Sequence, residues 1–239
     1  DINEKGAFKL FFEEPTRIPI SVLLKNFLNA GGSSFPEEFE YCANSVVENK
    51  KALSDLVRSE TLIMEAYSYI HFDSADERGI DVALLYKSAV FKVENSETFS
   101  VYLQNESGEQ DYTRDILLVE GILYNEPISI IVNHWSSRRE GTKETEFKRL
   151  AASNKVNSII KTLKNKNTNA KILVMGDFND NPNNNSIILM EKESQLYNPF
   201  KTVWSYDKGS LSYNFRWHLF DQILFSTNFF DANSSALAF

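Results

Sequence analysis

Hydrophobic residues follow two different periods along the chain, and their alternation predicts a fold built from both strands and helices. Continuous apolar runs at residues 80–86, 115–124 and 128–135 are typical of buried strands. A short polar turn at residues 125–127 joins the last two runs, which predicts an antiparallel hairpin. Further strands are predicted at residues 8–12, 171–178, 211–215 and 220–226.

A helical period is clearest at residues 142–164, where apolar side chains recur every three or four positions and lysines occupy the other positions. The predicted apolar face consists of Phe147, Leu150, Ala151, Ile159, Ile160 and Leu163. Shorter helices are predicted at residues 20–29, within residues 36–58, and from Ser186, which can cap its helix, to Met190.

The composition allows one large domain with a substantial core, since 42% of the 239 residues are hydrophobic. The 18 Phe and 10 Tyr residues favour a fold rich in sheet. Cys42 is the only cysteine, which excludes an internal disulfide and a thiolate metal cluster. No apolar run approaches the roughly 18 residues of a membrane helix, so no membrane span is expected.

The net charge of −8 argues against a passive, sequence-blind nucleic-acid binder. It is compatible with a nuclease, because divalent cations can bridge an acidic protein to a phosphate. Residues 138–166 have the opposite balance, with nine Lys or Arg against three Glu. This segment is either a solvated helix face or a flank that faces phosphate.

Three segments place polar residues where an apolar strand stops, which is where α/β folds position their active sites. In the first, His134 follows Asn133 at the end of residues 128–135, and Arg138 comes four residues later. A histidine beside an arginine suits a general acid next to a phosphate clamp. A hydrogen-bonded structural histidine is the alternative.

The second segment is Gly-Asp-Phe-Asn at residues 176–179. Gly176 allows a tight exit from the strand, Phe178 is expected in the core, and Asp177 and Asn179 are expected on one side. A carboxylate can orient water and an amide can donate to a phosphoryl oxygen; a plain polar turn is the alternative. In the third segment, Asp221 lies in an apolar strand and needs a partner, either a catalytic histidine or the backbone.

The order of these segments resembles the endonuclease/exonuclease/phosphatase superfamily. The chain has a strand ending in Asn133-His134, a helix, Gly-Asp-Phe-Asn at residues 176–179 and a strand containing Asp221. Residues 78–86 (Arg-Gly-Ile-Asp-Val-Ala-Leu-Leu-Tyr) extend the resemblance to a bacterial, deoxyribonuclease-like branch. The resemblance covers about residues 47–226. It implies a four-layered α/β sandwich of two mainly antiparallel sheets flanked by helices.

The resemblance also implies a reaction, the attack of water on a phosphodiester assisted by Mg²⁺ or Mn²⁺. His134 would protonate or hydrogen-bond the phosphate, Asp177 would position the water, and Asn179 would stabilise the transition state. Asp221 would orient a second histidine near the C-terminus. Asp177 would also contribute indirectly to the metal site.

Three further residues receive roles, the first of them by the same resemblance. Arg114 matches a phosphate-contacting arginine of the deoxyribonuclease relatives, and Arg138 is a second candidate for phosphate binding. Asp81, in the buried strand at residues 80–86, is a candidate to orient His134. The substrate would be nucleic acid or another phosphodiester.

The chain departs from the family pattern at both ends. Val46 occupies the position of a metal-binding Glu, and valine cannot ligate a hard cation. Glu48, expected on a helix, is the candidate substitute. The family's closing Ser-Asp-His does not follow Asp221. We therefore divide the chain into a divergent segment, residues 1–45, and a family-like domain, residues 46–239.

Three interpretations of these departures remain open. The sequence is part of a complete enzyme, or it is an inactive homologue that binds a protein partner as an accessory subunit of a larger assembly, or a partner chain or residues 1–45 supply the missing groups. The absence of disulfides and the richness in Asn and Phe agree loosely with a bacterial secreted or cell-envelope protein.

Overall fold

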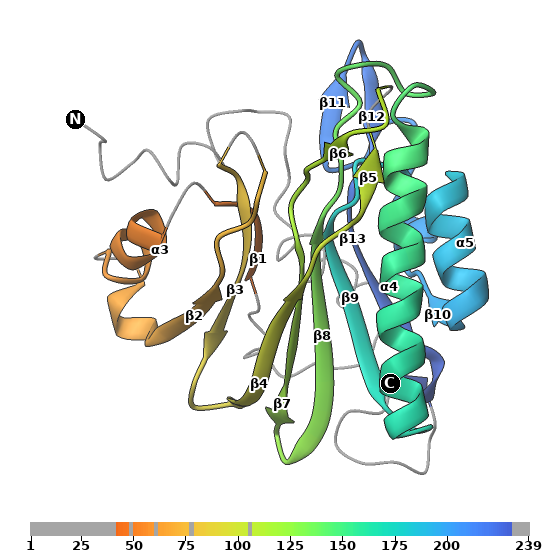
Figure 1. Ribbon diagram of the computed structural model, residues 1–239. Coiled ribbons are helices and arrows are strands. Elements are labelled where there is room, and N and C mark those ends of the chain that lie inside the picture. Colours follow the sequence, from red (N-terminus) through yellow and green to blue (C-terminus); the bar gives the residue numbers. More distant parts are fainter. Residues whose placement is uncertain (1–41, 48–49, 60–61, 77–78, 105–106, 231–239) are drawn as a thin grey trace.

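The protein folds into four layers, two of sheet between two of helix (Figure 1). The computed structural model describes residues 42–47, 50–59, 62–76, 79–104 and 107–230, and the fold is described for these residues. Helix α3 (Lys50–Val57) covers a three-stranded sheet, which packs on a six-stranded sheet. Helices α4 (Glu146–Lys166) and α5 (Asn185–Ser194) cover the outer face of the larger sheet. The predicted four-layered α/β sandwich is confirmed.

The smaller sheet is antiparallel, in the order β1-β3-β2. Its strands are β1 (Cys42–Val47), β2 (Tyr67–His71) and β3 (Asp81–Lys87). Successive residues of β3 point to opposite faces. Ala83 and Leu85 therefore pack with Leu53 of α3, whereas Leu84 packs into the core between the two sheets.

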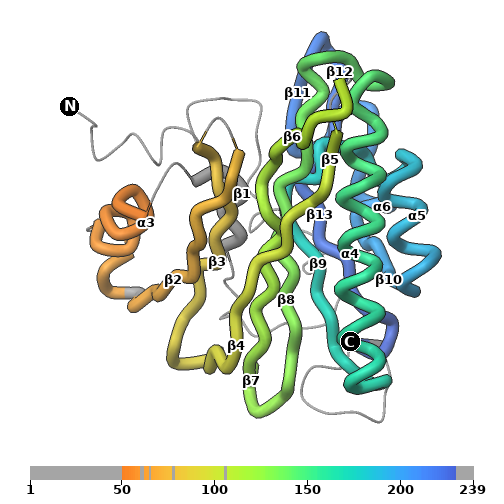
Figure 2. The backbone as a smooth tube through the Cα atoms, viewed as in Figure 1, coloured from red at the N-terminus to blue at the C-terminus, as the bar shows by residue number. Residues whose placement is uncertain are grey.

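The larger sheet has the order β10-β13-β9-β8-β7-β4, and its path along the chain can be followed in Figure 2. Only β8 and β9 are parallel, and α4 forms the connection between them. The predicted hairpin is confirmed as β7 and β8. The strands are β4 (Phe91–Phe99), β7 (Ile116–Leu123), β8 (Glu126–His134), β9 (Lys171–Asp177), β10 (Leu196–Tyr197) and β13 (Asp221–Ser226).

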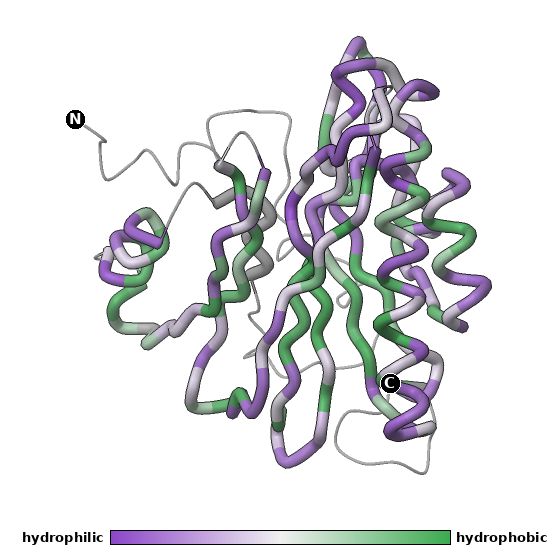
Figure 3. Tube along the Cα trace, in the orientation of Figure 1, coloured by the Kyte–Doolittle hydropathy of each residue, from purple (hydrophilic) through white to green (hydrophobic). Residues whose placement is uncertain are grey.

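The central strands of this sheet are buried on both faces, which explains their uninterrupted apolar runs. In β8, Ile130 and Val132 point into the core between the sheets, and Ile131 points toward the helices. Figure 3 shows hydrophobic positions concentrated along β8 and β9. These strands could be predicted from the sequence because their apolar runs are long and uninterrupted.

Among the described strands, β4 forms one edge of the larger sheet and pairs only with β7 on its inner side. Its pairing register shifts between Val93 and Asn95, so the strand carries a bulge or irregularity there. Several of its side chains are exposed, among them Lys92, Glu94 and Glu97.

Short elements complete the described chain. Strands β11 and β12 form a hairpin that Figure 1 shows projecting beyond the upper end of the larger sheet. Strand β11 was predicted from the sequence, whereas β12 was not. The bounds of the short elements are β5 (Leu103–Gln104), β6 (Gln110–Asp111), β11 (Leu211–Tyr213), β12 (Arg216–His218), α6 (Phe200–Val203) and the 3₁₀ helices Ile63–Glu65 and Thr227–Phe230.

The structure corrects three sequence-based expectations. Residues 42–47, expected in a helix, form β1, because sheet pairing with β3 overrides their local pattern. In α4, Phe147 is 50% exposed and Arg149 is buried, so the predicted apolar face is wrong at its start. Ser186 lies inside α5 and not at its cap, because its hydroxyl donates to Asp180.

Two predictions, the strand at residues 8–12 and the helix at residues 20–29, lie outside the described residues. The division of the chain at residue 45 stays a prediction. Among the described helices, none combines the length and the apolar character needed to cross a bilayer.

Gly176 allows β8 and β9 to approach each other closely just before the end of β9. Its φ is 137°, and a Cβ added there would lie 1.9 Å from the carbonyl oxygen of Asn133. We expect Gly176→Ala to lower the free energy of unfolding by about 3 kcal/mol or more, since a backbone atom cannot move aside cheaply.

Gly108→Ala is the matched control for this substitution. Gly108 also has a positive φ of 81°, but nothing lies within 4 Å of an added Cβ. Urea unfolding should therefore show a loss of about 1–2 kcal/mol from the backbone conformation alone. Equal losses in the two variants would contradict the importance of the close approach at Gly176.

Candidate active site

The parallel pairing of β8 with β9 brings two of the predicted residues together. His134 and Asp177 are the last residues of their strands and stand opposite each other in the register. Nε2 of His134 lies 3.9 Å from Oδ2 of Asp177. Their side chains are 9% and 1% exposed, so an acid–base group and a carboxylate meet at a largely water-excluded strand end.

A tight turn after Asp177 positions Asn179. The backbone N–H of Asn179 donates to Oδ1 of Asp177 over 2.8 Å, and its side-chain amide donates to the carbonyl of Trp135 over 2.9 Å. Asn179 has a φ of 49°, a left-handed conformation that asparagine tolerates better than most residues. The turn thus fixes the Asp177 carboxylate on one side and the Asn179 amide on the other.

Asp221 adds a second carboxylate at the same edge. It begins β13 and stands opposite Asp177 in the antiparallel pairing of β13 with β9. Residues directly opposite in such a pair project from the same face with their Cβ atoms about 5 Å apart. The structure therefore groups all three predicted strand ends, those of His134, Asp177 and Asp221.

Aromatic packing supports this edge from the helix side of the sheet. Trp135 and Phe178 are both buried, and their rings meet edge to face with centroids 4.8 Å apart. The predicted burial of Phe178 is confirmed. The Trp135 indole N–H donates to Oδ1 of Asn133 over 3.0 Å. Residues adjacent to the polar strand ends thus anchor them in the core.

Arg114 lies beneath the end of β8, and its guanidinium is 1% exposed. It donates to the carbonyls of His134 and Trp135 over 3.1 and 2.6 Å, and to Oδ2 of Asp76 over 3.1 Å. In this arrangement Arg114 holds two successive backbone carbonyls, those of His134 and Trp135. Its predicted role in phosphate binding stays a prediction.

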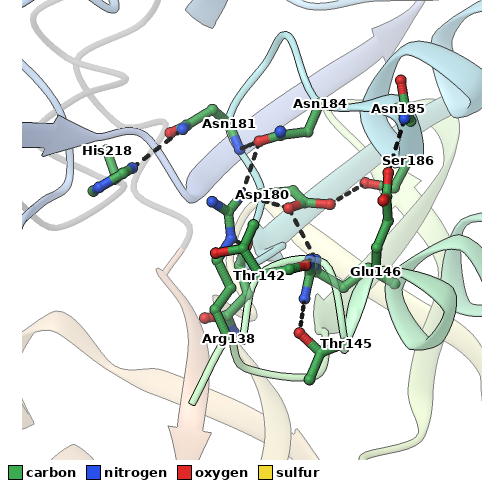
Figure 4. Close-up of polar contacts among 12 residues, drawn as sticks. Arg138, Thr142, Thr145, Glu146, Asp180, Asn181, Asn184, Asn185, Ser186 and His218 are labelled. Atoms are coloured by element: carbon green, nitrogen blue, oxygen red, sulfur yellow. Dashed lines mark hydrogen bonds and ion pairs between the residues drawn. The ribbon is translucent and has the colours of Figure 1, made fainter. Parts of the chain in front are cut away.

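A buried network of charges fixes the loop that follows Asn179 (Figure 4). Asp180 is 2% exposed, and its Oδ1 lies 2.9 Å from Nε of Arg149 and accepts a hydrogen bond from Arg138. Oδ2 of Asp180 accepts from the Ser186 hydroxyl over 2.5 Å. Arg149 also donates to the Thr145 hydroxyl over 2.7 Å, which ties the network to the start of α4.

Arg138 crosses from the loop after β8 to the loop after β9. Besides its bond to Asp180, it donates to the Asn179 carbonyl over 2.6 Å and to Oδ1 of Asn184 over 2.8 Å. Its guanidinium lies 4.7 Å from the centre of the Phe220 ring. Its side chain is 16% exposed. The prediction that it binds phosphate remains, and the structure also gives it a part in fixing Asn179.

His218 sits at the rim of this network, next to Asn181 (Figure 4). Oδ1 of Asn181 accepts from the Leu219 N–H over 2.8 Å, so its amide NH₂ is the group that faces Nδ1 of His218 at 3.2 Å. Burial, followed by the positive charges of Arg138 and Arg216, lowers the pKa of His218 below its ordinary value. A neutral ring whose Nδ1 accepts from Asn181 agrees with both observations.

One predicted pairing is wrong and one predicted ligand is not described. Asp81 accepts hydrogen bonds from His71 and Ser74, and the alternation of β3 directs it toward the α3 side of its sheet. It therefore does not orient His134, which lies on the face of β8 between the two sheets. Glu48 follows β1 in the sequence and lies outside the described residues.

Several residues that lie around this edge were not predicted from the sequence. Asp76, Arg149 and Asp180 carry buried charges, and buried charges require partners that only the fold reveals. Asp180 directly follows the Gly-Asp-Phe-Asn run, which was a usable signal. His71 ends an apolar strand as His134 does, so the rule that singled out His134 applied to it as well.

Comparisons with known proteins agree with this fold. The sequence profile of the endonuclease/exonuclease/phosphatase family matches residues 35–239. A comparison with curated protein sequences gives no match.

Solved structures share the fold at low sequence identity. An endonuclease/exonuclease/phosphatase from Bacteroides vulgatus superimposes with a TM-score of 0.58 and 14% identity, covering 86% of this chain and 77% of that one. The mannosyl-6-phosphatase Bt3783 of Bacteroides thetaiotaomicron superimposes with a TM-score of 0.56 and 15% identity, covering 87% of this chain and 76% of that one. The human Nocturnin catalytic domain superimposes with a TM-score of 0.53 and 19% identity. The match covers 70% of this chain and 63% of that domain.

The charge network predicts a large stability cost when Asp180 loses its charge. Asp180→Asn keeps the shape but leaves the buried guanidinium of Arg149 without its anionic partner. We expect urea unfolding to show a loss of about 3 kcal/mol, because the remaining charge keeps its desolvation cost. Asp207→Asn, at an exposed carboxylate, is the control and should change stability little. Similar behaviour of the two variants would contradict a structural role for the network.

His218 predicts a specific dependence of stability on pH. Because the folded state lowers the pKa of His218, the unfolded chain binds a proton more readily, and stability falls as the pH drops through the unfolded value of about 6.5. Between about pH 7.5 and 5.5, wild type should lose more free energy of unfolding than His218→Gln does. Denaturation followed by tryptophan fluorescence measures this difference, and parallel pH profiles would refute it.

Proposed function

Because the chain belongs to the endonuclease/exonuclease/phosphatase family, we propose that it hydrolyses phosphodiesters, with nucleic acid as the leading substrate class. The observation that carries the proposal is the meeting of His134 and Asp177 at 3.9 Å on paired strand ends. This separation is longer than a hydrogen bond, so both groups can act on a reacting phosphate or water placed beside them.

His134 and Asp177 suit complementary parts of the reaction. Nε2 of His134 can donate a proton to a phosphoryl or leaving oxygen, and Oδ2 of Asp177 can accept one from water. The Asn179 N–H on Oδ1 of Asp177 keeps that carboxylate oriented. Asn179 and the backbone that Arg114 holds would limit reorganisation as negative charge develops on the phosphate.

The residues at this edge fit the Mg²⁺ or Mn²⁺ that the family implies. Such cations take oxygen ligands, often one or two carboxylates together with waters and substrate phosphate. Asp177 and Asp221 stand opposite each other, so their carboxylates lie close enough together to take part in one cation site. When bound, the cation would neutralise phosphate charge and help to ionise the attacking water.

Positive charge next to the site favours an extended anionic substrate. Exposed Arg139 and Lys143 in the loop that leads to α4 are balanced by exposed Glu140 and Glu144, but residues 138–166 as a whole carry nine Lys or Arg against three Glu. Such a local excess of cations can raise the local concentration of a polyanion despite a net charge of −8. A nucleic acid matches this pattern better than a small phosphate ester does.

Hydrolysis of bis-nitrophenyl phosphate and of plasmid DNA, with Mg²⁺ or Mn²⁺ added, tests the proposal. We expect His134→Ala and Asp177→Asn each to lower kcat about 10²–10⁴-fold, because each removes a group that acts on the reacting atoms. Asp207→Asn, at an exposed position, should keep wild-type activity.

Two outcomes would contradict the proposal. A folded wild-type chain that turns over neither substrate with either metal would favour the alternative of an inactive homologue that binds a partner. Turnover unaffected by the His134 and Asp177 substitutions would place the chemistry elsewhere.

A further inference from the structure

A second cluster of ionisable side chains lies on the outer face of the three-stranded sheet. His71 ends β2 and Asp81 begins β3. Because alternate residues of a strand share one face, both lie on the same face as Tyr69, Ala83 and Leu85, which pack toward α3. The candidate active site lies on the other side of this sheet. His134 shares its face of β8 with Val132, which packs in the core between the two sheets. The two groups of residues therefore face different sides of the smaller sheet.

The register of β2 and β3 brings a third ligand to the same face. His71 pairs with Ala83, and extending this register by two residues sets Asp73 opposite Asp81. One ligand atom from each of His71, Asp73 and Asp81 lies within 4.8 Å of the other two. Nε2 of His71 and Oδ2 of Asp81 are 3.1 Å apart, with side chains 3% and 6% exposed, whereas Asp73 is exposed.

Asp81 is held in place by contacts that leave Oδ2 directed at His71. Its other oxygen, Oδ1, accepts from the backbone N–H of Ser74 over 2.8 Å and from the Ser74 hydroxyl over 2.7 Å. Metal-binding carboxylates are commonly fixed through one oxygen in this way, so that the other oxygen faces the ion.

We propose that His71, Asp73 and Asp81 form a binding site for a transition-metal dication such as Zn²⁺, separate from the candidate active site. One imidazole nitrogen and two carboxylate oxygens suit zinc, whereas Mg²⁺ prefers oxygen ligands throughout. Two ligands at about 2.1 Å from a tetrahedral zinc are roughly 3.4 Å apart, a few tenths of an ångström more than the 3.1 Å between His71 and Asp81.

Binding would require only small movements. Asp73 is exposed and can rotate toward the buried pair, and its ligand atom already lies within 4.8 Å of the other two. Zinc at Nε2 of His71 would require the neutral tautomer that carries its ring proton on Nδ1. A water can complete four-coordination on the exposed side.

The site connects physically to the end of β8. Asp73 and Ser74 belong to the loop between β2 and β3, and Asp76 of the same loop pairs with Arg114 at 3.1 Å. Arg114 in turn holds the carbonyls of His134 and Trp135. A metal that orders this loop would therefore also order the support beneath His134.

The chain has three histidines, which makes an NMR experiment decisive. Zn²⁺ is added to the full chain, and the imidazole signals of His71, His134 and His218 are followed, with Co²⁺ absorption as a second readout. We expect one equivalent of Zn²⁺ to shift the His71 signals selectively. Zn²⁺ at one hundred times its Kd should raise Tm by about 5 °C.

Two variants and two controls separate metal binding from folding. His71→Ala should abolish the Co²⁺ spectrum and the rise in Tm. Asp73→Asn changes an exposed side chain, so it should fold normally and weaken Zn²⁺ binding about tenfold or more. His218→Ala and Asp177→Asn should keep the site, because neither residue belongs to it.

The outcomes also separate this site from the proposed hydrolase. Zn²⁺ that shifts only His134 or His218, or that binds Asp73→Asn as tightly as wild type, would overturn the inference and leave His71 as a hydrogen-bonded structural histidine. Loss of Zn²⁺ binding in His71→Ala and Asp73→Asn but not in Asp177→Asn would support it, whether or not the chain hydrolyses phosphodiesters.

Discussion

The pairing of β8 with β9 is the constraint on which the rest of the structure depends. It is the parallel pairing of the larger sheet, and it ends with His134 facing Asp177. A shift of one residue would turn one of these side chains to the opposite face of the sheet. Gly176 permits the required closeness to Asn133, and α4 closes the connection between the two strands. The geometry of the reacting groups therefore follows from backbone pairing.

Around this pairing, buried charged side chains hold the loops that follow β8 and β9 in place. Arg114 holds the chain after β8, and Asp180 joins Arg138 and Arg149 after β9. Each ion pair carries a desolvation cost, and breaking one partner costs more than the pair gains. Such networks suit a site whose loops must keep one arrangement, because alternative arrangements would leave a charge buried without compensation.

The family resemblance implied the four layers, and polar strand ends singled out the candidate site, but the residues that support this site were not predicted. Long apolar runs and polar strand ends identified β8, β9, His134 and Asp177, since both signals are local. Arg149 could not be predicted, because its burial depends on Asp180, which lies on a different element. The same limit affected Ser186, whose hydroxyl binds Asp180 instead of capping α5, and Asp81, whose partner His71 comes from a neighbouring strand.

The edge strand β4 has a consequence for the behaviour of the protein in concentrated solution. A long open strand invites another chain to add to the sheet, which leads to aggregation. The register shift near Val93 interrupts the flat hydrogen-bonding surface, and Lys92, Glu94 and Glu97 would force charges against any incoming strand. Within the described part of the chain, the large sheet can thus end at β4 and still resist strand-to-strand association.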